Sequence, residues 1–255
     1  MPIILVTNDD GIHSEGLTAL YEAMMPLGDV YVVAPESEQS AVGHALTLHR
    51  PLKPHYRKEN IISVNGTPTD CVALAIKKLL PQKPDLVVSG INRGGNLGDD
   101  ITYSGTVSAA MEGALLGVSS VAFSLLGDEP YDFKKAAKFA FTISQMVLCD
   151  GLPEDTLLNV NVPNTDQIKG VKMTQQGKRR YDNSIRDMLD PWGRQQFWIG
   201  GGTPRWEQGE ETDFHAVREG FISITPIHLN LTNFEVLDLL KKKWQFSEEA
   251  LYVYR

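Results

Sequence analysis

The chain has 255 residues, of which 42% are hydrophobic and 22% charged, and its mean hydropathy is -0.19. This composition excludes a disordered or fibrous chain, and the length is enough for one large domain with a substantial core. The formal net charge of -8 argues against binding of a nucleic-acid polymer along the whole surface, although a local site for one phosphate is compatible with it.

The cysteine content and the hydropathy profile indicate a cytoplasmic protein. Cys71 and Cys149 are far apart and form no C-x-x-C motif, which excludes a zinc ribbon and a dithiol redox motif. Two separate thiols are typical of a reducing compartment. We expect neither a signal peptide nor membrane association, because the N-terminus has no basic segment and no stretch approaches the ~18 apolar residues of a spanning helix.

The first 170 residues alternate between strand-like and helix-like segments. Short, unbroken apolar runs, typical of strands buried on both faces, occur at 3–7, 30–34, 86–88, 121–125 and 157–160. Helices are expected between them, from Ser14 to the stop at Gly28, from Thr67 to the stop at Pro81, and over 106–116 and 132–148. This order predicts an α/β fold of three layers, with helices on both faces of a mostly parallel sheet.

From about residue 170 the pattern changes to short aromatic runs separated by turn residues. Strands are expected at 196–199, before a turn at 200–202, and at 221–226, and a helix over 234–244. Two interpretations stay open: an arm that projects toward a second subunit, or an antiparallel edge folded back on the same subunit. The chain is treated as a single domain, 1–255, with a core over about 1–170 and an arm and C-terminal segment over about 171–255.

Two adjacent carboxylates follow the first predicted strand directly, in the run Asn8-Asp9-Asp10-Gly11. Their mutual repulsion favours a hard cation with oxygen ligands, such as Mg²⁺ or Mn²⁺, and the glycine allows a sharp turn. A turn with solvated acids is the alternative interpretation. The position after a buried strand favours a site, because parallel sheets bind ligands at the carboxyl ends of their strands.

The loop after the third predicted strand, residues 90–100, is rich in asparagine and glycine. Asparagine amides can ligate a metal or donate to a phosphate, and glycines let backbone N–H groups approach an anion. A flexible surface loop is the alternative. Since the loop holds neither a G-x-G-x-x-G fingerprint nor a Walker motif, an NAD enzyme and a P-loop ATPase are both disfavoured.

Two further segments lie at the same predicted sheet edge. Ser104-Gly105-Thr106 opens a helix, whose N–H groups and dipole favour an anion, although plain capping is the alternative. The loop over 35–40 offers hydroxyls and acids that could complete a metal shell, and its pattern selects no single residue. The histidines of the first part of the chain do not have the spacing of a metal-binding motif such as H-E-x-x-H; they are His13, His44, His49 and His55.

A carboxylate pair, a hard metal and an anion pocket together favour metal-assisted phosphoryl hydrolysis. A phospho-receiver module would need an aspartate after the third strand, where the sequence reads Val88-Ser89-Gly90. A nucleotide-sugar transferase usually spaces its two acids by one residue, and here they are adjacent. No G-x-S-x-G elbow supports a serine hydrolase.

Longer runs resemble the SurE family of stationary-phase survival proteins, which are metal-dependent 5′/3′-nucleotidases. The resemblance covers nearly the whole chain and is thinner in the second half. Its runs are 5–12 with 15–17, 34–35 with 39–41 and 43, 64–72, 89–96, 103–107 and 109–113, then 190–191 with 198–201 in the arm, and 212–213, 216–217 and 220–226 in a later strand.

The resemblance implies a Rossmann-like sheet and a C-terminal β-hairpin and helix arm that builds a homodimer or homotetramer. It implies hydrolysis of nucleoside 5′- and 3′-monophosphates, with other phosphate esters or short polyphosphate as side substrates. One divalent ion per subunit, Mg²⁺ or Mn²⁺, would be held by Asp9, Asp10, Ser40 and Asn92, of which the two aspartates are catalytic. Substrate phosphate would bind at Asn8, Asn96, Ser104, Gly105 and Thr106.

Overall fold

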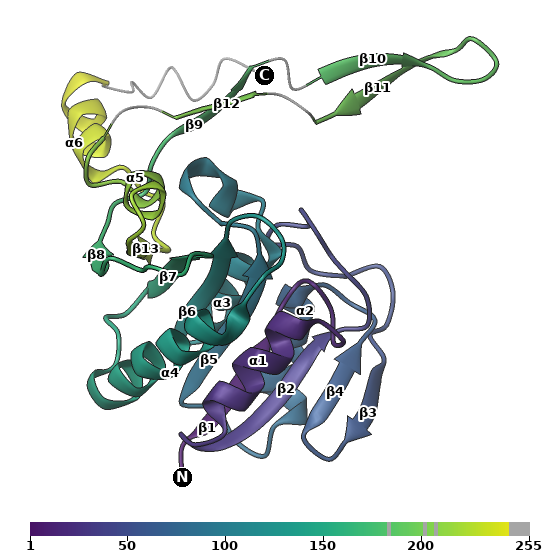
Figure 1. Cartoon of the computed structure of the whole chain (residues 1–255), viewed down its shortest axis with the longest axis vertical. Coiled ribbons are helices and arrows are strands. Elements are labelled where there is room, and N and C mark those ends of the chain that lie inside the picture. Colours follow the sequence, from purple (N-terminus) through teal and green to yellow (C-terminus); the bar gives the residue numbers. More distant parts are fainter. Residues whose placement is uncertain (183–184, 201–202, 207–208, 245–255) are drawn as a thin grey trace, which may run out of the picture.

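A computed structural model describes residues 1–182, 185–200, 203–206 and 209–244. Within these residues, nine strands form the central sheet: β1 (Ile3–Thr7), β2 (Asp29–Pro35), β3 (Pro54–Lys58), β4 (Ile61–Val64), β5 (Leu86–Arg93), β6 (Ser119–Leu126), β7 (Thr156–Pro163), β8 (Val171–Met173) and β13 (Ile222–His228). Their order across the sheet is β3-β4-β2-β1-β5-β6-β7-β13-β8 (Figure 1). Only β3 and β13 introduce antiparallel pairs into this sheet, with β4 and β7.

Helices cover both faces of the sheet, which confirms the predicted three-layer α/β architecture. On one face lie α1 (Glu15–Met24) and α4 (Phe133–Asp150), and on the other α2 (Pro68–Leu74) and α3 (Gly105–Leu115) (Figure 1). Strand alternation separates the two cores. In β1, Ile4 and Val6 pack with α1 and α4, whereas Ile3 and Leu5 pack with α2 and α3.

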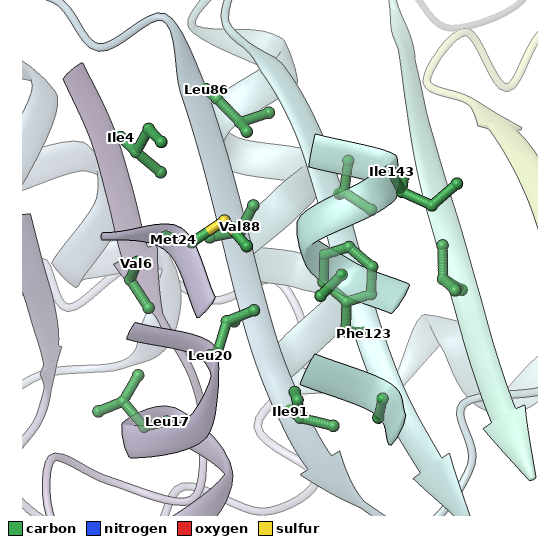
Figure 2. Close-up of a cluster of buried hydrophobic side chains, with 14 of the residues drawn as sticks. Ile4, Val6, Leu17, Leu20, Met24, Leu86, Val88, Ile91, Phe123 and Ile143 are labelled. Atoms are coloured by element: carbon green, nitrogen blue, oxygen red, sulfur yellow. The ribbon is translucent and has the colours of Figure 1, made fainter. Parts of the chain in front are cut away.

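The core between α1, α4 and the sheet is filled by large side chains from both layers. Leu17 and Leu20 of α1 face Val6 and Val88 of the sheet, and Phe123 of β6 lies beside them with no exposed surface (Figure 2). Both helices begin with a polar cap, since Ser14 accepts the Leu17 N–H and Asp132 accepts the Lys134 N–H.

The predicted strands and helices of the first half are confirmed, and four of the five strands are longer than predicted. The helix expected from Thr67 is α2 followed by a π-helical turn, Ala75–Leu79. The β3–β4 hairpin was not predicted from the sequence. Every residue of its first strand is exposed to solvent, so the strand has no apolar run that would identify it in the sequence.

The C-terminal part contains both a segment that folds back on the central sheet and a segment that projects from it, the two arrangements that the sequence left open. Strands β8 and β13 join the central sheet, and β13 folds back antiparallel to β7. Two ribbons extend away from the sheet, formed by β9 (Arg179–Asp182) with β12 (Thr203–Trp206) and by β10 (Ile185–Leu189) with β11 (Gln195–Ile199) (Figure 1). A boundary near residue 170 therefore does not separate core from arm.

Two helices complete the described C-terminal part. The run 212–213, expected within a strand, instead begins the short helix α5 (Asp213–Arg218), with Thr212 as its cap. The predicted final helix is confirmed as α6 (Phe234–Lys243). The turn expected at 200–202 falls largely on residues 201 and 202, which lie outside the described residues.

Two observations bear on the expectations drawn from composition. Cys71 is buried, Cys149 is exposed, and neither forms a disulfide. Among the described helices, none combines the length and apolar character that are needed to cross a bilayer.

Sheet topology creates a crevice between β1 and β5. From β1 the chain proceeds to β2 and β4 on one side, and from β5 it proceeds to β6 and β7 on the other. At such a switch point the loops after the two central strands diverge and leave room for a ligand. The candidate site should therefore lie where β1 and β5 end.

Phe123 should carry a large share of the free energy of unfolding. We expect Phe123→Ala to lower it by about 3–5 kcal/mol, because the deletion leaves a cavity between the sheet and α4. Urea unfolding followed by circular dichroism measures this change. Tyr56→Ala is the control, since Tyr56 is 64% exposed, and it should cost less than about 1 kcal/mol. Equal losses in the two variants would contradict the assignment of the core.

Candidate active site

A cavity of about 720 Å³ lies at the carboxyl ends of β1, β2 and β5. Its wall includes most of the polar residues singled out from the sequence, namely Asp9, Asp10, Ser40, Asn92, Asn96 and Ser104. Five segments supply it: the loops after the three strands, a 3₁₀ turn over Gly98–Thr102, and the start of α3. The predicted convergence at one sheet edge is therefore confirmed.

The carboxylate pair lies at the floor of this cavity, directly after β1. Asp9 is only 7% exposed, and the Thr106 hydroxyl donates a hydrogen bond to its Oδ1. The start of α3 approaches Asp9 closely because residue 105 is glycine: a Cβ at that position would lie 2.7 Å from the Asp9 Cβ. Gly105 and Thr106 therefore hold the carboxylate from behind and lie outside the cavity wall.

Burial raises the pKa of both carboxyl groups. For Asp9 the pKa rises to about 6, mainly because the group is removed from water, while the Thr106 hydrogen bond lowers it and the Asp10 charge raises it. The pKa of Asp10 is also raised by burial, against the opposing effect of the Arg93 backbone N–H and charge. Asp10 Oδ2 is buried and meets no hydrogen-bond donor among the described residues. An oxygen of this kind is ready to accept a cation.

The loop after β2 forms a second wall and is tied to the first. The Gln39 N–H donates to the Asp9 carbonyl at 2.8 Å, so the two loops are fixed side by side. Ser40 is exposed on the rim, and its hydroxyl donates to Glu38. Glu36 and Glu38 also line the cavity, which adds negative charge near the carboxylate pair.

The loop after β5 presents two asparagines whose amide groups are oriented by hydrogen bonds. The Asn92 Nδ2 donates to the Gly94 carbonyl at 2.8 Å, which leaves its Oδ1 as the side-chain acceptor. The Asn96 Nδ2 donates to Ser124 at 2.8 Å. Asn159 and Asn161, from β7, donate to the Asn96 carbonyl at 2.8 and 2.9 Å, and so fix the loop against the sheet.

Ser104 combines both roles that were weighed for it. Its hydroxyl oxygen accepts the Val107 N–H at 3.1 Å and so caps α3, and the residue also lines the cavity. The hydroxyl hydrogen is not used by that cap, so it can be donated to a ligand. Asn8, by contrast, is fully buried outside the cavity wall, where its Nδ2 bonds Gly11 O at 3.1 Å and Ser14 Oγ at 2.7 Å.

Sequence reasoning missed several residues of the cavity wall, among them His13, Arg93, Asp100 and Tyr103. Arg93 and Asp100 lie within the glycine-rich loop, but no spacing distinguished them from other polar loop residues. His13 shows no metal spacing in the sequence and lines the cavity because the turn after β1 brings it there.

Whether the site can hold a metal depends on oxygens other than carboxylates. Among the described residues, no three His, Cys, Asp or Glu side chains gather in a way that could hold a metal ion. The hydroxyl of Ser40 and the amide oxygen of Asn92 line the same cavity as the two aspartates. Together these four side chains form an all-oxygen set, which suits Mg²⁺ or Mn²⁺.

Comparison with known proteins finds close relatives over nearly the whole chain. Residues 4–183 match the family model described as Survival protein SurE. The 5′-nucleotidase SurE of Syntrophotalea carbinolica is 52% identical over 247 residues, which cover 96% of this chain and 98% of the relative. For that of Geotalea uraniireducens the identity is 54% over 247 residues, covering 96% and 99%. A crystal structure of the SurE protein from Aquifex aeolicus has a TM-score of 0.84 at 47% identity, covering 95% of this chain and 99% of that structure.

The buried Asp9 should make the metal-free protein less stable as the pH rises. Its pKa is about 6 in the folded chain against 3.8 for an ordinary aspartate, so the folded state binds the proton more tightly. The free energy of unfolding then falls between about pH 4 and pH 6, by up to ~3 kcal/mol. Asp9→Asn removes this charge, and we expect its melting temperature in EDTA at pH 7.5 to exceed that of the wild type.

The same two proteins should melt at similar temperatures near pH 4, where the wild-type carboxyl group is protonated. Differential scanning fluorimetry across this pH range measures both effects. If Asp9→Asn were less stable than the wild type at pH 7.5 in EDTA, the buried charge of Asp9 would not be what destabilises the metal-free protein.

Proposed function

This chain belongs to the SurE family and is a 5′-nucleotidase, and we propose that it hydrolyses nucleoside 5′- and 3′-monophosphates with the help of one divalent ion per subunit, Mg²⁺ or Mn²⁺. The observation that carries the metal proposal is the adjacent pair of buried Asp9 and half-buried Asp10 at the sheet switch point, with Asp10 Oδ2 left without a hydrogen-bond donor among the described residues. Two adjacent acids that are withdrawn from water in this way are best explained by a cation that offsets their charge.

Asp9, Asp10, Ser40 and Asn92 are the proposed metal ligands. When bound, a divalent ion supplies Lewis-acid stabilisation of phosphate charge and a more acidic water. The chain contributes the orientation of the ligands. The Thr106 hydroxyl fixes the Asp9 carboxylate, and the hydrogen bond to the Gly94 carbonyl fixes the Asn92 amide, so neither side chain has to be ordered when the substrate arrives.

Asn96, Ser104 and the start of α3 are proposed to hold the phosphate oxygens. A helix N-terminus favours an anion because its first N–H groups and its dipole point toward the charge. The Ser104 hydroxyl can donate one further hydrogen bond. Gly105 and Thr106 act in this proposal through the close packing of the helix start on Asp9, and Asn8 through its hydrogen bonds within the turn after β1.

Other phosphate esters and short polyphosphate are proposed as additional substrates. Most of the side chains that line the cavity carry acidic, hydroxyl or amide groups, and they form no closed apolar pocket for a base. Such a site places little restriction on the group that is esterified to the phosphate.

We also infer a homodimer or homotetramer built through the C-terminal arm, in the cytoplasm. The β10–β11 ribbon exposes Ile185, Leu189, Phe197, Trp198 and Ile199, whose exposed fractions range from 61 to 83%. Exposed apolar side chains gathered on one projecting ribbon favour burial against another surface. The low number of cysteines, two in 255 residues, is typical of a reducing compartment.

Release of inorganic phosphate from a panel of 5′- and 3′-nucleoside monophosphates and an aryl phosphate tests the reaction. We expect no release in EDTA and recovery when Mg²⁺ or Mn²⁺ is restored, because the ion offsets the charge of the two aspartates. Circular dichroism in EDTA serves as the control for folding. A folded protein that releases no phosphate with any metal would leave phosphate binding or signalling as the better interpretation.

Asn92→Ala tests the ligand set separately from the reaction. Loss of the amide oxygen should weaken metal binding by at least about tenfold, measured by isothermal titration calorimetry, while the fold is retained. Asn60→Ala is the matched control, because the Asn60 amide bonds the Val30 carbonyl at the amino end of β2, away from the cavity. Unchanged metal affinity and full activity in Asn92→Ala would refute the ligand assignment.

A further inference from the structure

The base of the C-terminal ribbon packs directly on one wall of the cavity. The 3₁₀ turn Gly98–Thr102 carries Asp100 toward the cavity and leads into Tyr103 and Ser104. On its other side the turn contacts Gly177 and Arg179, where the chain enters β9. In Figure 1, β9 and β12 cross above the sheet at this end of the molecule. One turn is thus shared between the cavity and the ribbon.

Asp213 lies at the centre of this contact and is completely buried. Its Oδ2 accepts the Gly98 N–H at 2.8 Å, and its Oδ1 accepts the Gly177 N–H at 3.0 Å and the Phe214 N–H at 2.7 Å. One carboxylate therefore joins three segments: the turn of the cavity wall, the chain leading into the ribbon, and the start of α5. Burial raises the pKa of Asp213, and the three N–H donors oppose that rise.

The close packing around Asp213 leaves no space for a side chain at Gly98 or at Gly177. A Cβ at Gly98 would lie 3.0 Å from the Gly177 carbonyl oxygen, and Gly98 has a φ of +55°. At Gly177, a Cβ would lie 2.8 Å from the Asp213 Oδ1. The turn and the ribbon base can approach each other this closely only because both positions are glycine.

Arg179 makes a second connection between the same two segments. Its backbone N–H donates to Asp99 at 3.1 Å, and its guanidinium forms an ion pair with Asp100, a residue of the cavity wall. The guanidinium also lies over the Trp206 ring, 4.9 Å from its centroid. Trp206 in turn stacks on Phe214, the neighbour of Asp213, with ring centroids 3.9 Å apart.

We propose that Asp213 is a positioning residue of the nucleotidase, which together with Arg179 fixes the turn Gly98–Thr102 and thereby the part of the cavity that receives the nucleoside. This inference rests on the proposed function. Neither residue lines the cavity, so each acts through the turn rather than on the substrate.

The nucleoside part of the cavity should depend on this turn more than the phosphate part does. The start of α3 is held independently, by the Thr106 hydrogen bond to Asp9 and by the packing of Gly105 on the same carboxylate. Asp100 and Tyr103, in contrast, follow the position of the turn, and Tyr103 is 67% exposed with a ring available for contact. A displaced turn would alter their placement and leave Asp9 and Asn92 in position.

The test compares Asp213→Asn with the wild type in two measurements. The first is KM and kcat for adenosine 5′-monophosphate, and the second is the inhibition constant of inorganic phosphate, which occupies the phosphate part alone. We expect KM to rise about tenfold, the factor that corresponds to one weakened hydrogen bond of a charged group. The kcat and the inhibition constant of phosphate should both stay within about twofold of the wild-type values, a change smaller than the loss of one such hydrogen bond would cause.

Two further variants complete the design. Arg179→Gln removes the ion pair with Asp100 and should raise KM as well. Because Arg179 is partly exposed, this variant can replace Asp213→Asn in the test if that variant does not fold. Asp85→Asn is the matched control: its carboxylate accepts the Ile3 N–H at 2.7 Å and joins two segments at the amino ends of the strands, the edge opposite the cavity. It should leave KM and the inhibition constant unchanged.

The possible outcomes separate the inference from its premise. An active wild type with an unchanged KM in both test variants would overturn the inference. So would a parallel loss of kcat, nucleotide affinity and phosphate affinity, since that pattern indicates general damage. A folded wild type that releases no phosphate with any metal would instead overturn the proposed function, and the inference with it.

Discussion

The structure of the site depends on two adjacent carboxylates at the end of β1, of which Asp9 is buried and Asp10 half-buried. Removing Asp9 and Asp10 from water raises their free energy in the charged form, and their proximity adds repulsion. The fold offsets part of this strain with the Thr106 hydroxyl and the Arg93 backbone N–H, and it leaves Asp10 Oδ2 without a donor among the described residues. The remaining imbalance gives the site its affinity for positive charge.

Only one place in this sheet can bring the required groups to such a pair. β1 lies between β2 and β5, so the loops from both neighbours end beside it, and the helix that follows the β5 loop starts against Asp9. Strands β6 and β7 lie further along the sheet, and their side chains Ser124, Asn159 and Asn161 bond Asn96 from behind. Topology thus determines which loops line the cavity and which strands support those loops.

The sequence was sufficient for features that depend on neighbouring residues. Apolar runs predicted the parallel strands, and the polar residues at the strand ends predicted Asp9, Asp10 and Asn92 in one cavity. It was not sufficient for Asp213, which bonds Gly98 across 115 positions, because no local pattern distinguishes a buried capping acid from a solvated one. Strand β3 was not predicted for a different reason: all its residues are exposed, so its sequence has no apolar periodicity that would identify a strand.

The composition of the chain changes near residue 170, but the sheet continues beyond it. The polar, turn-rich second half supplies β13 and β8 to one side of the central sheet, as well as the two ribbons that extend away from it. Asp213 and Arg179 lie where these two parts meet, and both contact the turn that leads to Ser104. The same side chains, Asp213 and Arg179, therefore determine both where the ribbon lies and how the outer part of the cavity is shaped.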